Sequence, residues 1–257
     1  MDTALRNSIW NVFDRQVWSK EGFLHNQGNI PHIEHITRTM WDHLYKLPMD
    51  SRPKWFHTGG TTEMMQQIRQ RFYEGSWSDV YDFVEFMVTL LSDRRPELVP
   101  ELNYVLQREL AGYRIVSGVV ADITSPHEVQ ALEEVIDDTR FGGTAAHLQR
   151  ALELFSHRQQ PDYRNSIKES ILAVESMARV VADSEKATLA DALKALEKSK
   201  KLHTALKDGF GKLYGYVNDE QGIRHAMLEE PNLTAADARY FLLSCTSFVN
   251  YLKSQLP

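Results

Sequence analysis

The chain has 257 residues, of which 42% are hydrophobic and 25% are charged, as is ordinary for a globular protein with a buried core. No apolar run approaches the roughly 20 residues that a membrane-spanning helix needs, and the opening residues lack the basic start and apolar stretch of a signal peptide. The single cysteine, Cys245, excludes an internal disulfide and a cysteine-rich zinc site. We therefore expect a cytoplasmic protein whose one thiol lies in the core.

Charge and tryptophan are distributed unevenly, which predicts two domains of different character. The net charge of −6 combines 14 basic and 21 acidic residues at positions 1–140 with 15 basic and 14 acidic residues at positions 141–257. The later part concentrates its positive charge in lysines at positions 194, 198, 200, 201, 207 and 212. Such a run attracts phosphates, although a solvated helix face has the same composition. All five tryptophans lie at or before Trp77.

Apolar periodicity in the first part predicts successive amphipathic helices followed by a β-hairpin. The repeats at helical spacing are Ile33, Ile36, Met40 and Leu44, then Val80, Phe83, Val84, Met87 and Leu91. A stretch with prolines and glycines at 48–60 predicts a loop between them. Two short β-rich runs flank Ser117-Gly118 and predict a hairpin near 113–123 with a two-residue turn. Ser125 and Pro126 then mark the start of another helix.

Glycines at 142 and 143, followed by Thr144, predict a break in the chain. We therefore expect an N-terminal helical domain over 1–141 and a C-terminal domain over 145–257. Stripes of apolar residues after position 145 predict an antiparallel bundle of four or five helices. Ser166 and Glu169 are spaced as a capping box at the start of one of these helices. The expected fold class is mainly α, with one small β-hairpin.

Histidine and glycine spacings predict neither a metal site nor a phosphate-binding loop. His32 and His35 stand three positions apart beside Glu34, which is not the HExxH arrangement of helical zinc sites. The paired glycines at 59–60 and 142–143 lack the lysine of a nucleotide-binding loop. We expect no metal and no other cofactor.

The segment Gly222-Ile223-Arg224-His225, at a junction between two predicted helices, combines side chains suited to RNA cleavage. Arginine can hold a phosphate through two hydrogen bonds and stabilise the charge that develops on it. Histidine titrates near neutrality and can move the proton of a ribose 2′-hydroxyl. Glu175 lies beside an apolar stripe, where a carboxylate needs a cation such as Arg224. A structural ion pair between Glu175 and Arg224 explains the same pattern equally well.

Four blocks spread over nearly the whole chain carry a family resemblance. They read LRNSIWNVFD, LNYVLQRELAGYRIVSGVVADITSPHEVQALEE, PDYRNSIKESILAVES and LYGYVNDEQGIRHAM. These blocks resemble a bacterial group of proteins with an N-terminal domain of the abortive-infection J type, a domain that accompanies phage-defence proteins. The C-terminal part resembles the HEPN superfamily of helical bundles. Many HEPN domains are metal-independent ribonucleases that place one motif from each subunit of a dimer in a shared cleft.

The HEPN resemblance implies a motif of an arginine, a polar residue and a histidine a few positions further on. Arg224 matches the arginine and His225 matches the polar position, but positions 228–231 hold no histidine. Two alternatives follow from this departure. Either His225 itself moves the proton, or the bundle is a degenerate HEPN domain used for binding or regulation.

Together with the resemblance, these residues predict a cytoplasmic phage-defence protein whose HEPN-like domain binds RNA as a homodimer. Metal-independent cleavage of that RNA is a further hypothesis, which the missing histidine leaves open. In this hypothesis Arg224 holds the phosphate, His225 acts as acid or base, and Glu175 orients one of them. The expected RNA-binding residues are Lys168, Lys200, Lys201, Lys207 and Lys212. The N-terminal domain would sense a phage or host protein trigger. The alternative hypothesis is a non-enzymatic RNA- or protein-interaction module.

Overall fold

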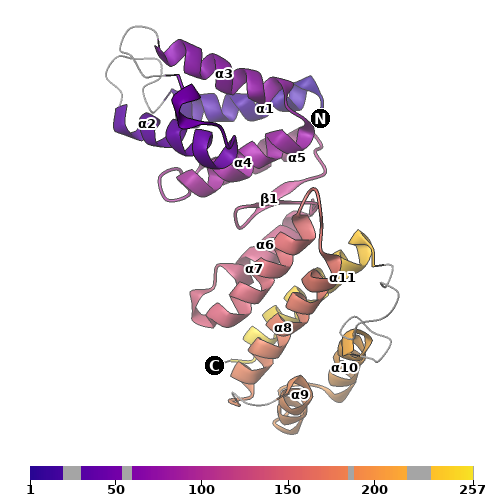
Figure 1. The fold of residues 1–257 in the computed structure, drawn as a ribbon. Helices are drawn as coiled ribbons and strands as arrows, with labels where there is room; N and C mark the ends of the chain where they lie inside the picture. The colour runs from indigo at the N-terminus through magenta and orange to yellow at the C-terminus, as the bar shows by residue number, and fades with distance from the viewer. Residues whose placement is uncertain (20–29, 54–59, 185–187, 219–232, 257) are drawn as a thin grey trace. The chain divides into compact units, whose positions relative to one another are not determined.

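The computed structural model describes residues 1–19, 30–53, 60–184, 188–218 and 233–256 (Figure 1). Within those residues the chain forms eleven α-helices and one two-stranded antiparallel sheet, so the expected fold class is confirmed. The chain divides into two compact units, Met1–Asp122 and Ile123–Pro257, which we call the N-terminal and C-terminal units.

The N-terminal unit packs its helices around an aromatic core. Its described elements are α1 (Thr3–Phe13) with a π-helical extension η1 (Asp14–Trp18), α2 (Ile30–Thr39) with a π-helical extension η2 (Met40–Leu44), a 3-10 turn (Met49–Ser51), α3 (Gly60–Glu74), α4 (Trp77–Leu91), α5 (Leu98–Arg108), β1 (Arg114–Val116) and β2 (Val119–Ala121). The rings of Phe13 and Phe83 meet edge to face, with centroids 5.0 Å apart. Trp10, Trp18 and Trp41 are buried, which places three of the tryptophans in this core.

The predicted hairpin is confirmed, including its two-residue turn. Ser117 and Gly118 have φ values of 44° and 85°, the left-handed conformations that such a turn needs and that glycine adopts freely. The side-chain amide of Asn103, on α5, donates to the Ile115 carbonyl and its oxygen accepts from the Ile115 amide, each at 2.8 Å. The hairpin is thereby anchored to the helices of the N-terminal unit.

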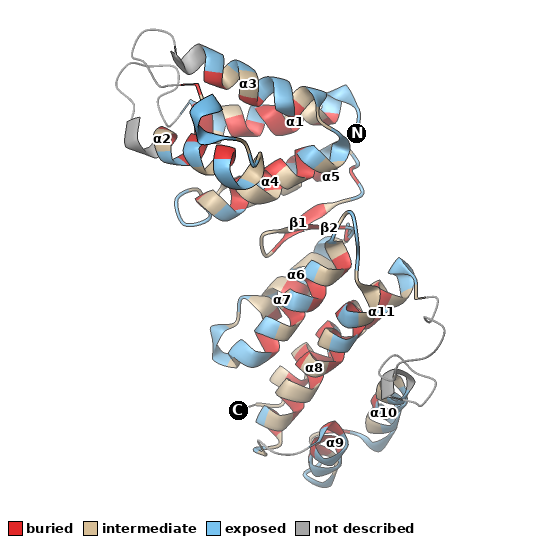
Figure 2. Cartoon of the chain, viewed as in Figure 1, coloured by how far each residue is buried: buried red, intermediate tan, exposed pale blue. Residues whose placement is uncertain are grey.

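The C-terminal unit is a helical bundle centred on α8. Its described elements are α6 (Pro126–Ile136), a 3-10 turn (Thr139–Phe141), α7 (Gly142–Ser156), α8 (Tyr163–Val181), α9 (Leu189–Lys198), α10 (Thr204–Asn218) and α11 (Ala235–Lys253). Helix α8 packs against α7, α11 and α9, and α6 packs against α7 and α11. Figure 2 shows the buried residues as stripes along α7, α8 and α11, as the apolar periodicity predicts. Cys245 lies in this core, and burial raises the pKa of its thiol.

The predicted chain break at Gly142–Thr144 is wrong, because these residues begin α7. Helix α6, which the sequence assigned to the first domain, packs within the C-terminal unit. The two compact units divide before α6, and the expected domain boundary between 141 and 145 stays a prediction. Helix α6 packs against α7 and α11, and its Leu132 and Val135 are buried.

The predicted helix start at Ser125 is confirmed, whereas the capping box at Ser166 is wrong. The Ser125 side chain caps α6 and Pro126 occupies its first turn. Helix α8 begins earlier than predicted, at Tyr163, and the Asp162 carboxylate accepts from the Asn165 amide at 3.0 Å. Ser166 is fully buried, and its hydroxyl donates to the Ala151 carbonyl of α7 at 2.8 Å.

The Asp138 carboxylate forms ion pairs that join the 3-10 turn before α7 to the end of α11. The side chains of Arg140 and Lys253 donate to Asp138 Oδ2 at 2.8 and 2.7 Å. These bonds, that of Arg140 first, hold the pKa of Asp138 well below its usual value. These interactions of the ionised Asp138 stabilise the folded state fully above the unfolded-state pKa of about 3.9. Their contribution is lost as the pH falls towards the folded-state pKa.

Asp138→Asn should therefore destabilise the C-terminal unit at pH 7, and the difference from the wild type should shrink as the pH falls below about 4. Urea unfolding followed by far-UV circular dichroism over a pH series measures both effects. Asp93→Asn is the control, because Asp93 is an exposed residue of the N-terminal unit. A stability difference that is constant from pH 7 to strongly acidic pH would contradict the ion-pair account.

Candidate nucleic-acid interface

The lysine run, positions 194, 198, 200, 201, 207 and 212, lies on α9, on α10 and in the turn between them. Helix α9 packs on α8 and buries one apolar face, made of Leu189, Ala192, Leu193 and Leu196. Its lysines are consequently left on the solvent side. Lys194, Lys198, Lys200 and Lys212 are exposed, and Lys201 is half-buried.

The turn that carries Lys200 and Lys201 ends α9. Lys200 has a φ of 60°, a left-handed conformation that stops the helix, and its amide donates to the Glu197 carbonyl at 2.9 Å. The backbone of Lys201 is held by α11, because the Tyr251 hydroxyl donates to the Lys201 carbonyl at 3.3 Å. These contacts give the two neighbouring lysines a defined place at the surface.

Lys207 differs from the other members of the run because acidic side chains already bind it. Its ammonium lies 2.8 Å from Glu197 Oε2 and 3.3 Å from Asp208 Oδ1. The hydrogen bond to Glu197, followed by the hydrogen bond to Asp208, raises the pKa of Lys207. A phosphate would have to compete with two carboxylates for this ammonium, which argues against Lys207 as an RNA-binding residue.

Lys168 stands apart from the lysine run. It is an exposed residue near the N-terminal end of α8, whereas α9 follows the C-terminal end of α8 at Val181. At 1.5 Å per residue, Lys168 lies roughly 20 Å from that end along the helix axis. Its expected role in RNA binding stays a prediction.

Glu175 has a cationic partner on its own helix. The Arg179 guanidinium, one turn later on α8, donates to Glu175 Oε1 at 2.5 Å. Both side chains are partly exposed, at 16% for Glu175 and 38% for Arg179. The cation that the sequence pattern calls for beside this carboxylate is thus supplied by Arg179. Arg224 and His225 lie outside the described residues, so the expected pairing of Glu175 with Arg224 and the catalytic roles of all three stay predictions.

A histidine–carboxylate pair between α7 and α8 has no signal in the sequence spacing. His147 Nδ1 and Glu169 Oε2 are 2.7 Å apart, and both side chains are partly exposed. The pair links adjacent helices and combines a group that can transfer a proton with one that can orient it. Only the register of α7 on α8 brings these two residues together. Finding the pair from the sequence would have required knowing how α7 and α8 align along their length.

Within the described ranges, no group of three or more His, Cys, Asp or Glu side chains is arranged to hold a metal ion. The backbone of His32 is described but its side chain is not, so the histidine spacing near the N-terminus stays a matter of sequence alone. No helix in the described part of the chain combines the length and apolar character needed to cross a membrane.

Residues 1–138 match the family model described as AbiJ N-terminal domain 4. The chain belongs to this family. The match covers the N-terminal unit together with α6, and family membership suggests a role in abortive-infection phage defence. No curated protein and no solved structure matches the chain. Residues after 138 lie outside the AbiJ N-terminal domain 4 match, so their expected HEPN character stays a prediction.

Proposed function

We propose that this abortive-infection protein binds RNA through its C-terminal unit, which we interpret as a HEPN-like bundle acting as a homodimer. The observation that carries the proposal is the exposed lysine surface on α9 and α10. Between positions 194 and 212, the acidic residues Glu197 and Asp208 both lie against Lys207. Lys194 lies near Asp191, whereas the exposed Lys198, Lys200 and Lys212 keep a local positive field although the whole chain carries a net charge of −6.

A sugar–phosphate backbone suits this surface better than a folded acidic protein does. Flexible, exposed lysines bind phosphates as point charges and need no matched shape. Binding of this kind is independent of sequence and weakens steeply as salt rises. These properties predict that the C-terminal unit recognises RNA chiefly by its charge.

We infer a second, finer activity for the same unit, metal-independent RNA cleavage by Arg224 and His225. In the proposed step His225 takes the proton of a ribose 2′-hydroxyl, and the freed oxygen attacks the adjacent phosphorus. The bond to the 5′ oxygen then breaks, and the departing oxygen receives the proton that His225 has taken. Arg224 would stabilise the charge on the phosphate during this step.

One observation favours a structural rather than a catalytic role for Glu175. Its pairing with Arg179 accounts for its position by structure alone, which weakens its assignment as the residue that orients Arg224 or His225. RNA binding by the lysine surface does not depend on this assignment. A binding module with a degenerate HEPN domain is therefore the alternative to the nuclease.

The double substitution Lys200→Gln with Lys201→Gln should weaken RNA binding by removing two neighbouring charges from the lysine surface. For single-stranded nucleic acid, log affinity falls with log salt by about 0.7 for each phosphate that the protein neutralises. The double variant neutralises two fewer phosphates, so its slope should be shallower by about 1.4. At about 0.1 M salt the affinity should drop on the order of tenfold. Fluorescence anisotropy with a short single-stranded RNA oligonucleotide measures both quantities.

Arg38→Gln with Arg94→Gln is the matched control. It removes the same charge from exposed positions of the N-terminal unit and should leave the salt slope unchanged. Equal losses in the two double variants would show that RNA responds to net charge alone and would exclude the lysine surface. Absence of RNA binding by the wild-type chain at low salt would exclude the proposal itself.

A further inference from the structure

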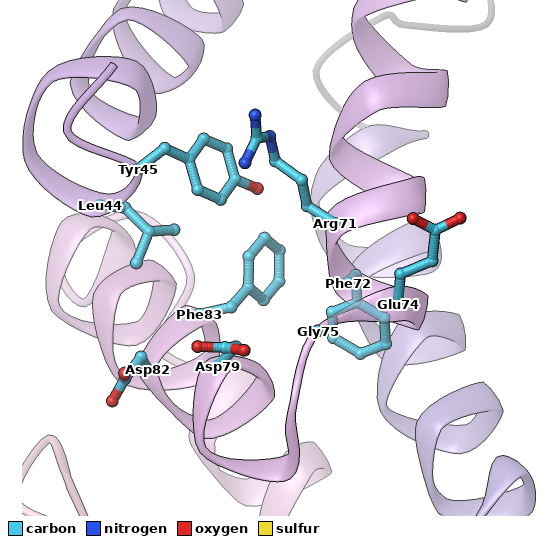
Figure 3. Close-up of a pocket in the computed structure, with 9 residues that line it drawn as sticks. All are labelled: Leu44, Tyr45, Arg71, Phe72, Glu74, Gly75, Asp79, Asp82 and Phe83. Atoms are coloured by element: carbon cyan, nitrogen blue, oxygen red, sulfur yellow. The ribbon is translucent and has the colours of Figure 1, made fainter. Parts of the chain in front are cut away.

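A pocket of about 450 Å³ lies in the N-terminal unit, between the end of η2, the end of α3 and the first turns of α4 (Figure 3). Two of its charged side chains already have partners within the unit. The Asp79 carboxylate caps α4 and accepts from the Ser76 amide at 2.6 Å. The Arg71 guanidinium lies over the Tyr45 ring, 5.0 Å from its centre. Packing of the N-terminal unit therefore accounts for these groups, and a surface of the C-terminal unit is better suited to a ligand.

Helix α11 presents a face without charge to the solvent. Tyr240, Ser244, Ser247 and Tyr251 recur at intervals of three or four residues, so they lie on one side of the helix. Tyr240 is 54% exposed and Ser247 is exposed, whereas Ser244 and Tyr251 are half-buried. Exposed aromatic side chains on a face depleted of charge are typical of a contact surface.

The charged residues of α11, all of which the structure describes, are engaged away from this face. Asp237 caps the start of the helix. Arg239 binds Glu128 of α6 at 2.9 Å, and Lys253 binds Asp138 at 2.7 Å. The charges of α11 thus serve the fold of the C-terminal unit, and the tyrosine face is left to uncharged side chains.

The Tyr251 ring is held in one orientation by its neighbours. Its hydroxyl donates to the Lys201 carbonyl at 3.3 Å. Its plane is nearly parallel to that of Phe248, at an angle of 13° and with centroids 6.0 Å apart, and Phe248 in turn stacks on Phe210 of α10 at 4.1 Å. A flat group that stacks on Tyr251 would extend this set of parallel rings, and Tyr251 would lose little conformational freedom on binding it.

Positive charge adjoins the Tyr251 end of the face. The turn between α9 and α10 that binds the Tyr251 hydroxyl carries Lys200, which is exposed, and Lys201, which is half-buried. A ligand can therefore place a flat ring on the tyrosine and a negative group beside a lysine. Single-stranded nucleic acid has both groups in every nucleotide, and its bases are free to stack on aromatic side chains. The bases of a duplex are paired and stacked on one another, so they cannot reach such a ring.

We propose that single-stranded RNA lies along the exposed face of α11. One unpaired base stacks on Tyr251 and another on Tyr240, while Lys200 and Lys201 bind phosphates beside them. The two tyrosines are 11 positions apart, about 16 Å along the helix, so each ring takes a base from a different nucleotide. The inference rests on RNA binding by the C-terminal unit and adds to it a preference for unpaired bases.

Fluorescence anisotropy with the full chain tests the proposal on three probes: a short single-stranded RNA, the same RNA as a duplex, and an abasic ribose–phosphate strand of equal length. The double variant Tyr240→Leu with Tyr251→Leu keeps apolar side chains and removes both rings. It should bind the single strand at least about tenfold more weakly than the wild type does. The duplex and the abasic strand should bind both proteins equally. The dependence on salt should not change, because the tyrosines neutralise no phosphate.

Single variants separate stacking from folding. Tyr251→Phe keeps the ring, so its affinity for the single strand should stay within about twofold of the wild type. Tyr240→Leu changes an exposed side chain and should weaken binding about fivefold by itself, which keeps the test valid if Tyr251→Leu disturbs the bundle. Tyr104→Leu is the control, because this ring, on α5 of the N-terminal unit, is 63% exposed. Circular dichroism melting of each variant distinguishes lost binding from lost folding.

Two results would overturn the proposal: unchanged affinity of the folded tyrosine variants for the single strand, or an equal loss of affinity for the duplex and the abasic strand. Light scattering adds a third, because tyrosine variants that turn a dimer into a monomer and keep their single-strand affinity would assign this face to a second copy of the chain.

Failure of this inference and failure of RNA binding give different results. If RNA binding responds to Lys200→Gln with Lys201→Gln but not to the tyrosine variants, only the stacking site is wrong. If the wild-type chain binds no RNA at low salt, the proposed function is wrong as well.

Discussion

Replacing Arg224 by alanine should remove the RNA damage and growth arrest that the proposed nuclease causes during phage infection. Loss of one group that stabilises a developing oxyanion typically lowers the rate of such a step about 10²–10³-fold. His225→Ala should have a similar effect, because loss of a general acid or base costs about 10²–10⁴-fold. RNA integrity on denaturing gels and growth of phage-infected cells measure the two outcomes.

Glu175 and Arg179 provide the control that separates a catalytic from a structural role. Glu175→Gln and Arg179→Gln break the same ion pair on α8. If Glu175 orients a catalytic group, Glu175→Gln should lower RNA cleavage while Arg179→Gln leaves it unchanged. If the pair is only structural, both variants should shift stability by a similar small amount and cleave RNA as the wild type does.

The nuclease proposal is wrong if wild-type protein damages neither RNA nor growth with phage present, or if Arg224→Ala retains full cleavage. Intact RNA together with salt-dependent RNA binding would identify the degenerate binding module instead. The variants Lys200→Gln and Lys201→Gln would then still separate specific binding by the lysine surface from general charge. The two sets of variants therefore distinguish the absence of RNA cleavage from the absence of RNA binding.

Ser166→Leu should strongly destabilise the C-terminal unit. Ser166 has no exposed surface, and its hydroxyl reaches the Ala151 carbonyl of α7 at 2.8 Å, so the two helices leave no room for a larger side chain. Overpacking of a core typically costs about 1–3 kcal/mol, and the lost hydrogen bond adds about 1 kcal/mol. That sum is a large share of the roughly 5–15 kcal/mol that stabilises a typical domain.

The tryptophans make this effect measurable in the intact chain. All five lie at or before Trp77, so tryptophan fluorescence reports the N-terminal unit, whereas far-UV circular dichroism reports helices of both. Ser166→Leu should shift the urea transition seen by circular dichroism. We expect a smaller shift in the transition seen by fluorescence.

Two smaller substitutions control for this result. Ser166→Ala removes the hydroxyl without adding volume and should cost about 1 kcal/mol. Asp162→Ala removes the cap that α8 actually uses and should also cost about 1 kcal/mol. If Ser166→Leu proves no more destabilising than Ser166→Ala, the close approach of α7 and α8 is refuted.

Local sequence determined most of the secondary structure. The Ser117-Gly118 turn was predictable because few residues adopt left-handed φ values, and the Ser125 cap because serine competes well for free helical amides. The stripes on α4, α7, α8 and α11 were predictable because a helix must bury one face. Each of these features depends on residues near one another in the chain.

Tertiary structure decided the features that depend on distant residues. Ser166 and Glu169 have the spacing of a capping box, but packing of α8 on α7 placed Ser166 in the core and Glu169 beside His147. Lys207 looked like its neighbours in sequence until α9 and α10 brought Glu197 against it.

The same distinction applies to the candidate sites. The sequence by itself located the family, the lysine run and the segment that contains Arg224 and His225. It could not place His147 beside Glu169, because the two residues belong to different helices and only the packing of α7 on α8 brings them together. Composition and spacing determine which helices form, whereas the register between helices determines which polar side chains meet.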